Sequence, residues 1–330
     1  MKKIGIFSLF LFIISACETE IKNDDVTIID DSIASIIDKS SKIEIIADSL
    51  IVSEGPLWDE NSKSLIFTDV AQNKMFTWNE KEGVQDFIQP SGYTGYSPAF
   101  EKGLNGANGI AYNKSGDIVI CQHGDRRVAL IANQKTNDPI FTTIIDNYDG
   151  KKFNSPNDLS IASNGDIYFT DPPYGFFQMA SSSFDNRYKE LEFNGVFKLS
   201  NEGDLSLVSK EMSIPNGIVL SLDEKYVYVN NSDTEDPKIM KFDTENFQGE
   251  LFFDGKELTK KYQGGFDGLK VHSSGNIFST GPNGILIISP QGDLLGTINF
   301  GGGVTNCNFD TNEEYLYVTA FSYVARIKLK

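Results

Sequence analysis

Short runs of β-branched and aromatic residues recur along the chain, and each run follows a turn that contains glycine or acidic residues. Almost no segment shows the 3.6-residue repeat of an amphipathic helix. The pattern therefore predicts strands. The six copies are Ser64–Asp69, Gly116–Ile120, Gly165–Thr170, Glu224–Val229, Gly275–Thr280 and Glu314–Thr319.

The spacing of these six runs indicates a repeat architecture. Residues at matching positions lie 53, 49, 60, 50 and 39 residues apart; they are Leu65, Ile118, Ile167, Val227, Ile277 and Leu316. A period near ~50 residues, filled with short strands, is typical of a β-propeller with one blade per repeat. We therefore predict an all-β fold, a six-bladed β-propeller with four-stranded blades, over residues 43–330. A β-sandwich with a second domain does not explain six similarly spaced copies.

Two further expectations concern the ends of the chain and the longest gap. A propeller ring leaves no free edge when strands from both termini share a blade. The strands predicted at Ile43–Ile46 and Val324–Leu329 are the candidates for that shared blade. The extra length between the third and fourth runs corresponds to an insertion at Gln178–Leu191. We expect this insertion to form a lid over the central mouth.

The first residues have the features of a targeting segment. Lys2 and Lys3 precede an apolar run, Ile4–Ile14, that is too short to span a bilayer. The residues before Cys17 are small and resemble a bacterial lipobox. This predicts removal of residues 1–16, lipidation of Cys17, an acidic tether over residues 17–42, and a location at the bacterial cell envelope, on the periplasmic or the outer side. The alternative is an ordinary signal peptide in which Cys17 is incidental.

Charge and cysteine content restrict the partners. The chain has 46 acidic and 29 basic residues and a formal net charge of -17, so it has no basic surplus for nucleic acid or an anionic membrane surface. Membrane contact is expected through the lipid only, and we expect a monomer. Cys121 and Cys307 lack the paired spacing of a zinc site and are predicted to be buried free thiols, with a disulfide as the alternative.

One carboxylate or amide residue precedes each of the six runs by seven to eleven residues. These residues are Glu54, Asn108, Asn157, Asn216, Asp267 and Asn306. Inner strands of a propeller converge on its axis, so six such side chains would form a ring of oxygens. The alternative is local, because Asn-Gly and Asp-Gly are common turn dipeptides. The repeated offset favours the ring.

A ring of oxygen ligands with two carboxylates suits one hard divalent cation. Ca²⁺ is the first choice, followed by Mg²⁺ and Mn²⁺. Zn²⁺ fits least, since the chain has only two histidines and no cysteine cluster. The sequence therefore predicts a central metal site.

Five segments resemble the senescence-marker-protein/gluconolactonase (SGL) family. They are Glu54–Trp58, Ala107–Ile110, Cys121–Arg127, Asn154–Gly175 and Phe266–Lys270, and the likeness covers nearly the whole chain after residue 45. The resemblance implies a six-bladed propeller with one catalytic divalent cation that hydrolyses sugar lactones, and more distant relatives include paraoxonase-type lactonases. It also implies metal ligands at Glu54, Asn157, Asn216 and Asp267.

The resemblance identifies one departure from the family pattern. In the sugar-lactonase branch an aspartate that is both ligand and base usually ends the fourth blade's strand, and by spacing its counterpart here is Asn231. A neutral amide cannot act as a base. Asp267 is therefore our preferred catalytic base, and Asp233 is the alternative.

Other residues are candidates for the surroundings of the cation. The resemblance to paraoxonases gives His123 a possible part in proton transfer or substrate binding, while a structural role stays open. Asn108, Arg126, Asp158 and Tyr174 are further substrate-binding candidates; Arg126 could instead cap a strand, and Asp158 is expected to support the Asn157 loop.

The predicted reaction is lactone hydrolysis, in which the cation polarises the carbonyl and activates water. Two alternatives remain: a non-enzymatic, anchored propeller that binds carbohydrate or peptide around a structural cation, and an esterase or phosphotriesterase of the paraoxonase type.

Overall fold

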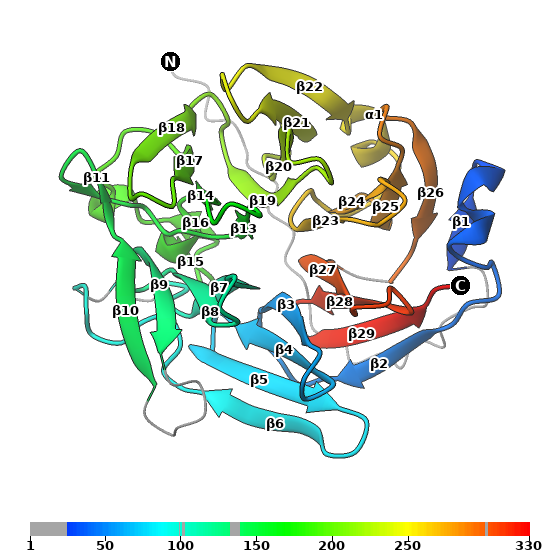
Figure 1. The fold of residues 1–330 in the computed structure, drawn as a ribbon, viewed down its shortest axis with the longest axis horizontal. Helices are drawn as coiled ribbons and strands as arrows, with labels where there is room; N and C mark the ends of the chain where they lie inside the picture. Colours follow the sequence, from blue (N-terminus) through cyan, green and yellow to red (C-terminus); the bar gives the residue numbers. More distant parts are fainter. Residues whose placement is uncertain (1–24, 99, 101–102, 133–138, 301–302) are drawn as a thin grey trace.

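The computed structural model describes residues 25–98, 100, 103–132, 139–300 and 303–330. Within them, six antiparallel sheets are arranged around a central axis (Figure 1). The prediction of a six-bladed β-propeller with four-stranded blades is confirmed. The signal segment and Cys17 lie outside the described residues.

Each blade is built from strands that follow one another outward from the axis. Blade 1 contains β3 (Ser53–Asp59), β4 (Ser64–Asp69), β5 (Lys74–Asn79) and β6 (Gly83–Ile88). Blade 2 contains β7 (Ala107–Tyr112), β8 (Ile118–Gln122), β9 (Arg127–Ala132) and β10 (Ile140–Ile145). Blade 3 contains β13 (Leu159–Ile161), β14 (Ile167–Asp171), β17 (Gly195–Leu199) and β18 (Leu205–Ser209).

The second half of the ring repeats this order. Blade 4 contains β19 (Pro215–Leu220), β20 (Tyr226–Asn231), β21 (Lys238–Asp243) and β22 (Gly249–Asp254). Blade 5 contains β23 (Leu269–Val271), β24 (Ile277–Gly281), β25 (Gly284–Ile288) and β26 (Leu294–Ile298). Blade 6 contains β27 (Asn306–Phe309), β28 (Tyr315–Ala320), β29 (Tyr323–Lys328) and β2 (Ile43–Ala47).

The remaining elements lie in connections. They are β11 (Asn147–Tyr148), β12 (Lys151–Lys152), η2 (Tyr174–Phe176), β15 (Phe177–Gln178), β16 (Ser183–Phe184), η3 (Asn186–Tyr188) and α1 (Lys256–Thr259). The six runs of the sequence pattern form the second strand of each blade. These strands are buried on both faces, as β4 and β14 show by being buried along their whole length, which explains their β-branched and aromatic composition.

The ring is closed by both ends of the chain, as predicted. β2 pairs with β29 in an antiparallel register that places Ile43 opposite Ile327. Figure 1 shows this early strand lying beside the last one in the same blade. The outer strand of blade 6 comes from the N-terminal part of the chain and its three partners from the C-terminal end, so their pairing holds the ring closed.

Part of the predicted tether is folded against blade 5. β1 (Val26–Ile28) adds a fifth strand beside β26, and η1 (Asp31–Ser35) follows it. Ile33 and Ile37 are fully buried in the cluster formed by blades 5 and 6. This stretch is acidic overall, but its few apolar residues pack against the blades. The propeller domain therefore begins at residue 26 or earlier, and not at residue 43 as predicted.

The interior consists of separate apolar clusters between neighbouring blades. Phe67, Phe169 and Phe278 in the second strands are fully buried there. Cys121 and Cys307 are buried and free, as predicted. Across the described ranges, the helices are too short and too polar to traverse a lipid bilayer.

Candidate metal centre

The recurring polar residues lie at the start of the inner strands, at one end of the axis. Glu54, Asn108 and Asn216 are inside β3, β7 and β19, while Asn157 and Asp267 lie two residues before the first residues of β13 and β23. Glu54, Asn108, Asn157 and Asn216 are each at most 5% exposed. Neighbouring inner strands contact each other around the ring, so residues from separate blades meet at the axis.

The glycines after these residues serve close packing. The Gly109 N–H donates to the Asn157 carbonyl at 2.7 Å, and the Gly217 N–H donates to the Asp267 carbonyl at 2.9 Å. A Cβ atom at Gly217 would lie 2.1 Å from that carbonyl oxygen. The Asn-Gly pairs of blades 2 and 4 therefore lie in strands and allow the next blade to approach, and the turn interpretation is wrong for them.

In these contacts, the glycine after one ring residue donates to the carbonyl of the ring residue in the next blade. The corresponding contact from Gly268 identifies Thr305 as the sixth member of the ring. Gly268 donates to the Thr305 carbonyl at 2.7 Å, which puts Asn306 one residue further along the strand. The cause is the hairpin of blade 6, where Phe309 pairs with Leu316, seven residues on; in blade 3 Ile161 pairs with Ile167, six residues on. The prediction that Asn306 belongs to the ring is therefore wrong.

Two carboxylates face one another within this ring. Burial, with a contribution from the charge of Asp158, raises the pKa of Glu54 to about 7, although hydrogen bonds from Gly55 and Asn306 act in the opposite direction. Burial also raises the pKa of Asp267 well above its usual range, and the charges of Glu54 and Asp158 add to this. A positive charge between Glu54 and Asp267 would offset the cost of ionising both.

The two amides of the proposed ligand set are oriented by residues outside the ring. Asn216 Nδ2 donates to Ser232 Oγ at 2.8 Å, and the Ser232 hydroxyl donates to the Phe266 carbonyl. Asn157 Nδ2 lies 3.5 Å from His123 Nε2. Because the amide nitrogens are engaged, the amide oxygens are left for a ligand.

Several oxygens in this region are buried without a hydrogen-bond partner among the described residues. They are Oδ1 of Asn157, Oδ1 of Asn108 and Oδ1 of Asp267. A buried oxygen without a donor costs free energy, so such atoms identify a place for a bound group. Two carboxylates and several neutral oxygens fit a hard divalent cation. No group of three or more His, Cys, Asp or Glu side chains is close enough to hold a metal in the described part of the chain, so amide oxygens have to complete the coordination.

The structure gives His123 a role in orientation. The side chain is 1% exposed, and burial lowers the pKa of its imidazole to about 4, so the ring is neutral at pH 7. In the tautomer with the proton on Nδ1, Nε2 of this neutral ring can accept from the Asn157 amide 3.5 Å away and so orient it. His123 therefore lies beside the centre, where its contact is to a ligand candidate.

Asn231 does not face the ring. Its Oδ1 accepts from the Ile214 N–H at 2.9 Å, and its Nδ2 donates to the Asp236 carbonyl at 2.9 Å and to Ser213. Asp171 plays the same part in blade 3, where it accepts from the backbone of Asn154 and Ser155. The amide at position 231 therefore holds a loop and takes no place in the centre.

Asp233 is also directed away from the ring. Its Oδ1 accepts from the Glu235 N–H at 3.0 Å, and its carbonyl accepts from Asp236, which closes a local turn. Among the two candidate bases, Asp267 is the one that lies in the ring.

Arg126 and Arg127 are engaged with protein groups. Arg126 Nε donates to the Phe153 carbonyl at 2.6 Å, and its NH1 pairs with Glu190 of the insertion at 3.0 Å. The Arg126 guanidinium also lies over the Phe176 ring. This arginine joins the insertion to blade 2, which supports the structural alternative over substrate binding.

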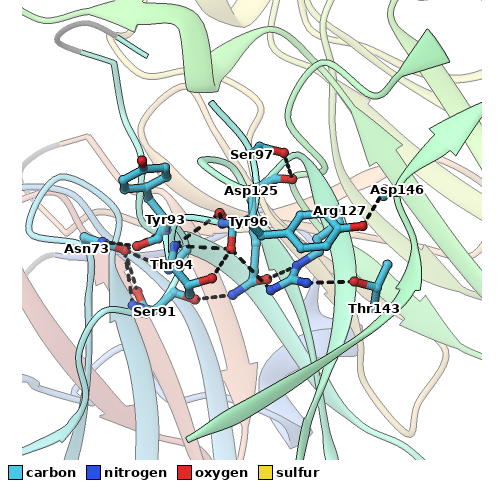
Figure 2. A network of polar contacts seen from close by, with 12 residues as sticks. Asn73, Ser91, Tyr93, Thr94, Tyr96, Ser97, Asp125, Arg127, Thr143 and Asp146 are labelled. Atoms are coloured by element: carbon cyan, nitrogen blue, oxygen red, sulfur yellow. Dashed lines mark hydrogen bonds and ion pairs between the residues drawn. The ribbon is translucent and has the colours of Figure 1, made fainter. Parts of the chain in front are cut away.

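Figure 2 shows the neighbouring network around Asp125 and Arg127. Asp125 is fully buried and accepts from the Thr94 and Tyr96 N–H groups at 3.1 and 3.2 Å, while Arg127 pairs with it at 3.2 Å. The Arg127 guanidinium lies 4.0 Å from the centroid of the Tyr96 ring. The network anchors the connection between β6 and β7.

The anchored connection runs on to the centre. The backbone carbonyl of Gly106 accepts from the His123 N–H at 3.3 Å, so this connection also positions the histidine.

Tyr174 borders the ring from the insertion side. Burial raises the pKa of its hydroxyl, the charge of Asp267 adds to this, and interactions with Ser232 and Asn216 oppose it. Its ring contacts Phe184 of the insertion, with 5.9 Å between the centroids. A phenol is protonated at neutral pH even at its ordinary pKa, so the Tyr174 hydroxyl can donate a hydrogen bond to a group bound in the ring.

One residue of this region, Ser232, was missed in the sequence, and a second, Asn306, was predicted in the ring but lies one residue beyond it. Ser232 orients Asn216, but it lies in a loop without any repeat signal. Asn306 donates from Nδ2 to Glu54 Oε2 at 3.1 Å and lies 3.5 Å from Asp158 Oδ2. Asp158 Oδ1 accepts from the Leu159 N–H at 2.9 Å, so Asp158 supports the backbone directly after Asn157, as predicted. Its other carboxylate oxygen is the one near Asn306, so the side chain faces the axis.

Comparisons with known proteins identify the family and agree with the propeller fold. The family described as "SMP-30/Gluconolactonase/LRE-like region" matches residues 52–322. A gluconolactonase from Zymomonas mobilis subsp. mobilis is 36% identical over 312 residues, which cover 89% of this chain and 83% of that protein. A gluconolactonase structure from Xanthomonas campestris has a TM-score of 0.79 at 25% identity, covering 92% of this chain and 95% of that one. Regucalcin from Agrobacterium tumefaciens, at 16% identity and a TM-score of 0.63, shares the fold, with 86% of this chain and 92% of that chain covered.

Proposed function

Because the chain belongs to the SMP-30/gluconolactonase/LRE-like family, we propose that it hydrolyses a sugar lactone with one divalent cation bound in the axial ring. The observation that supports the site is the set of buried oxygens without donors beside two carboxylates of raised pKa. The gluconolactonase relatives support a lactone hydrolase. Ca²⁺ is our first choice, with Mg²⁺ or Mn²⁺ as alternatives.

The residues that would hold the cation are Glu54, Asn157, Asn216 and Asp267. A bound cation would act as a Lewis acid for the lactone carbonyl and lower the pKa of water nearby. Ser232 and His123 contact the nitrogens of the Asn216 and Asn157 amides, so both amide oxygens would be available to the cation. The buried surroundings strengthen each of these electrostatic interactions.

The chain's own groups carry the proton transfers. Asp267 has an oxygen without a donor and is suited to accept the proton of the water that attacks the carbonyl carbon. As the ring C–O bond breaks, this proton passes to the leaving oxygen, and the product is a hydroxy acid. Tyr174 stays protonated and would donate to a substrate oxygen, and Asn108 would accept from a substrate hydroxyl.

A pH-indicator assay tests the proposal. We expect turnover of glucono-lactone, or of another lactone in a panel, that a chelator abolishes and Ca²⁺ restores. Turnover of aryl esters or phosphotriesters alone would support the paraoxonase-type alternative. Folded protein that turns over none of these compounds in the presence of Ca²⁺, Mg²⁺ or Mn²⁺ would contradict the enzyme assignment and favour a binding module.

We also propose that the protein is anchored at the bacterial cell envelope through Cys17, which lies outside the described residues. A lipid on Cys17 would keep the full-length protein in the membrane fraction of cells, and Cys17→Ser is expected to release it into the soluble fraction. Equal fractionation of the two proteins would contradict the anchor.

A further inference from the structure

The axial channel carries a second layer of residues directly beneath the ring. At the position after each ring residue, four blades have glycine, namely Gly55, Gly109, Gly217 and Gly268. Blades 3 and 6 have Asp158 and Asn306 there. These two blades are three places apart around the ring in either direction, so the two side chains come from opposite sides of the channel.

The two side chains meet across the axis. Asn306 Nδ2 lies 3.5 Å from Asp158 Oδ2, and Asp158 and Asn306 are 3% and 2% exposed. The glycines make room for them. A Cβ atom at Gly268 would lie 2.0 Å from the Asn306 side chain, and one at Gly109 would lie 2.5 Å from Asp158 Oδ1. The channel is thus filled at this level by one carboxylate and one amide.

Both the oxygen and the nitrogen of the Asn306 side-chain amide have hydrogen-bond partners. Its Oδ1 accepts from the Cys307 N–H at 2.9 Å, which leaves both Nδ2 hydrogens for the channel. One is directed to Asp158 and the other to Glu54 Oε2, at 3.1 Å. Glu54 Oε2 also accepts from the Gly55 N–H at 2.9 Å. With Oε2 held by two donors, the second oxygen of Glu54 is the one left for a ligand in the ring.

We propose that Asn306 and Asp158 form a floor that closes the axial channel beneath the ring, and that Asn306 is the positioning residue that orients the Glu54 carboxylate for cation binding. The second part rests on the cation site of the proposed function. Residues that hold a ligand by a hydrogen bond commonly affect metal affinity by about 10- to 100-fold. Opposite blades share the floor, so it also couples the two halves of the ring.

The test compares two asparagines on the same strand. Asn306→Leu removes the donor to Glu54 at nearly constant volume and charge. Asn308→Leu is the matched control, because Asn308 Nδ2 donates at 2.8 Å to the backbone carbonyl of Pro56 and not to the Glu54 carboxylate. Calorimetric titration with Ca²⁺ alone is expected to show about 10- to 100-fold weaker binding for Asn306→Leu and wild-type affinity for Asn308→Leu.

Two results would overturn the positioning role: Asn306→Leu binding Ca²⁺ as tightly as wild type, or Asn308→Leu losing as much affinity as Asn306→Leu. Should Asn306→Leu fail to fold, Asn306→Ser carries the same expectation, because a serine is too short to reach Glu54. Wild-type protein that binds no Ca²⁺ would contradict the cation site itself. The floor is then tested by thermal unfolding in chelator, where Asn306→Leu is expected to unfold at a lower temperature than Asn308→Leu, and equal midpoints would contradict it.

A second pair of variants reaches the same amide from blade 5. The Cβ atom of Gly268→Ala would displace the Asn306 side chain, whereas a Cβ atom at Gly265 has no neighbour within 4 Å. Gly268→Ala is expected to weaken Ca²⁺ binding by a factor similar to Asn306→Leu, and Gly265→Ala to leave it unchanged. Combining Gly268→Ala with Asn306→Ser, which vacates the space, is expected to add no further loss. Fully multiplicative losses in the combined variant would contradict a shared cause.

Discussion

Asp267→Asn is expected to lower the rate of lactone hydrolysis by about 100- to 10,000-fold, the usual contribution of a positioned acid or base. The substitution keeps the shape of the side chain and one neutral oxygen for the cation, but an amide accepts no proton. The rate constant at saturating lactone and Ca²⁺ is the measurement. Substrate binding changes little, because the loss falls on the proton transfer.

The same variant is expected to be more stable than wild type without cation. Burial and the charge of Glu54 raise the pKa of Asp267, so the ionised carboxyl destabilises the cation-free fold at neutral pH. An amide removes this charge. A gain of about 1 kcal/mol raises the unfolding midpoint by about 2–4 °C in domains of 150–250 residues, and a shift of this order in chelator is expected.

Asp233→Asn is the matched control for both measurements. Asp233 was the alternative base in the sequence, but its carboxylate closes a local turn with Glu235. Its amide variant is expected to keep nearly full activity and an unchanged midpoint. An inactive Asp233→Asn beside an active Asp267→Asn would exchange the two roles and contradict the mechanism.

The architecture could be predicted because the same strand pattern occurs six times in the sequence, once in each blade. Each second strand is buried on both faces, so it contains a run of apolar residues that shows the spacing of the repeat. The pairing of β2 with β29 was predictable because a closed ring leaves no free strand edge. The segment around Ile33 and Ile37 was not predicted, because its few apolar residues are scattered among acidic ones and only the surface of blades 5 and 6 gives them a place.

The centre was predicted less completely. Five ring residues follow from similar offsets before the runs, but the exact offset depends on hairpin length. In blade 6, where Phe309 pairs with Leu316, Thr305 and not Asn306 takes the sixth place. Counting residues between paired strands in each blade would have detected this. Ser232 and His123 lie in loops between the second and third strands of their blades. These loops differ from blade to blade, so no repeated pattern predicts their contacts.

Stability in the absence of cation is expected to fall as the pH rises from about 4.5 to about 7. The pKa of Glu54 is raised from 4.5 to about 7, chiefly by burial. Between these values the unfolded chain has released the proton and the folded protein still binds it, so each increase in pH favours unfolding. A shift of this size corresponds to a loss on the order of 3 kcal/mol for this group.

Ca²⁺ is expected to abolish this fall. A cation between Glu54 and Asp267 favours their ionised forms, so binding releases protons and strengthens as the pH rises. The stabilisation by saturating Ca²⁺ is therefore expected to be small at pH 5 and largest at pH 8. Denaturant unfolding at both pH values, in chelator and in Ca²⁺, measures all four free energies.

Glu54→Gln separates this carboxyl from the many acidic groups of the surface. Carboxyls such as those of Asp166 and Asp236 have lowered pKa values and give the opposite pH slope, but they are the same in both proteins. The difference between wild type and Glu54→Gln in chelator thus isolates the buried group. Parallel pH curves for the two proteins in chelator would show that the pKa of Glu54 is not raised. A wild-type curve that Ca²⁺ leaves unchanged would show that the ring binds no cation, so the raised pKa and the cation site are tested by separate measurements.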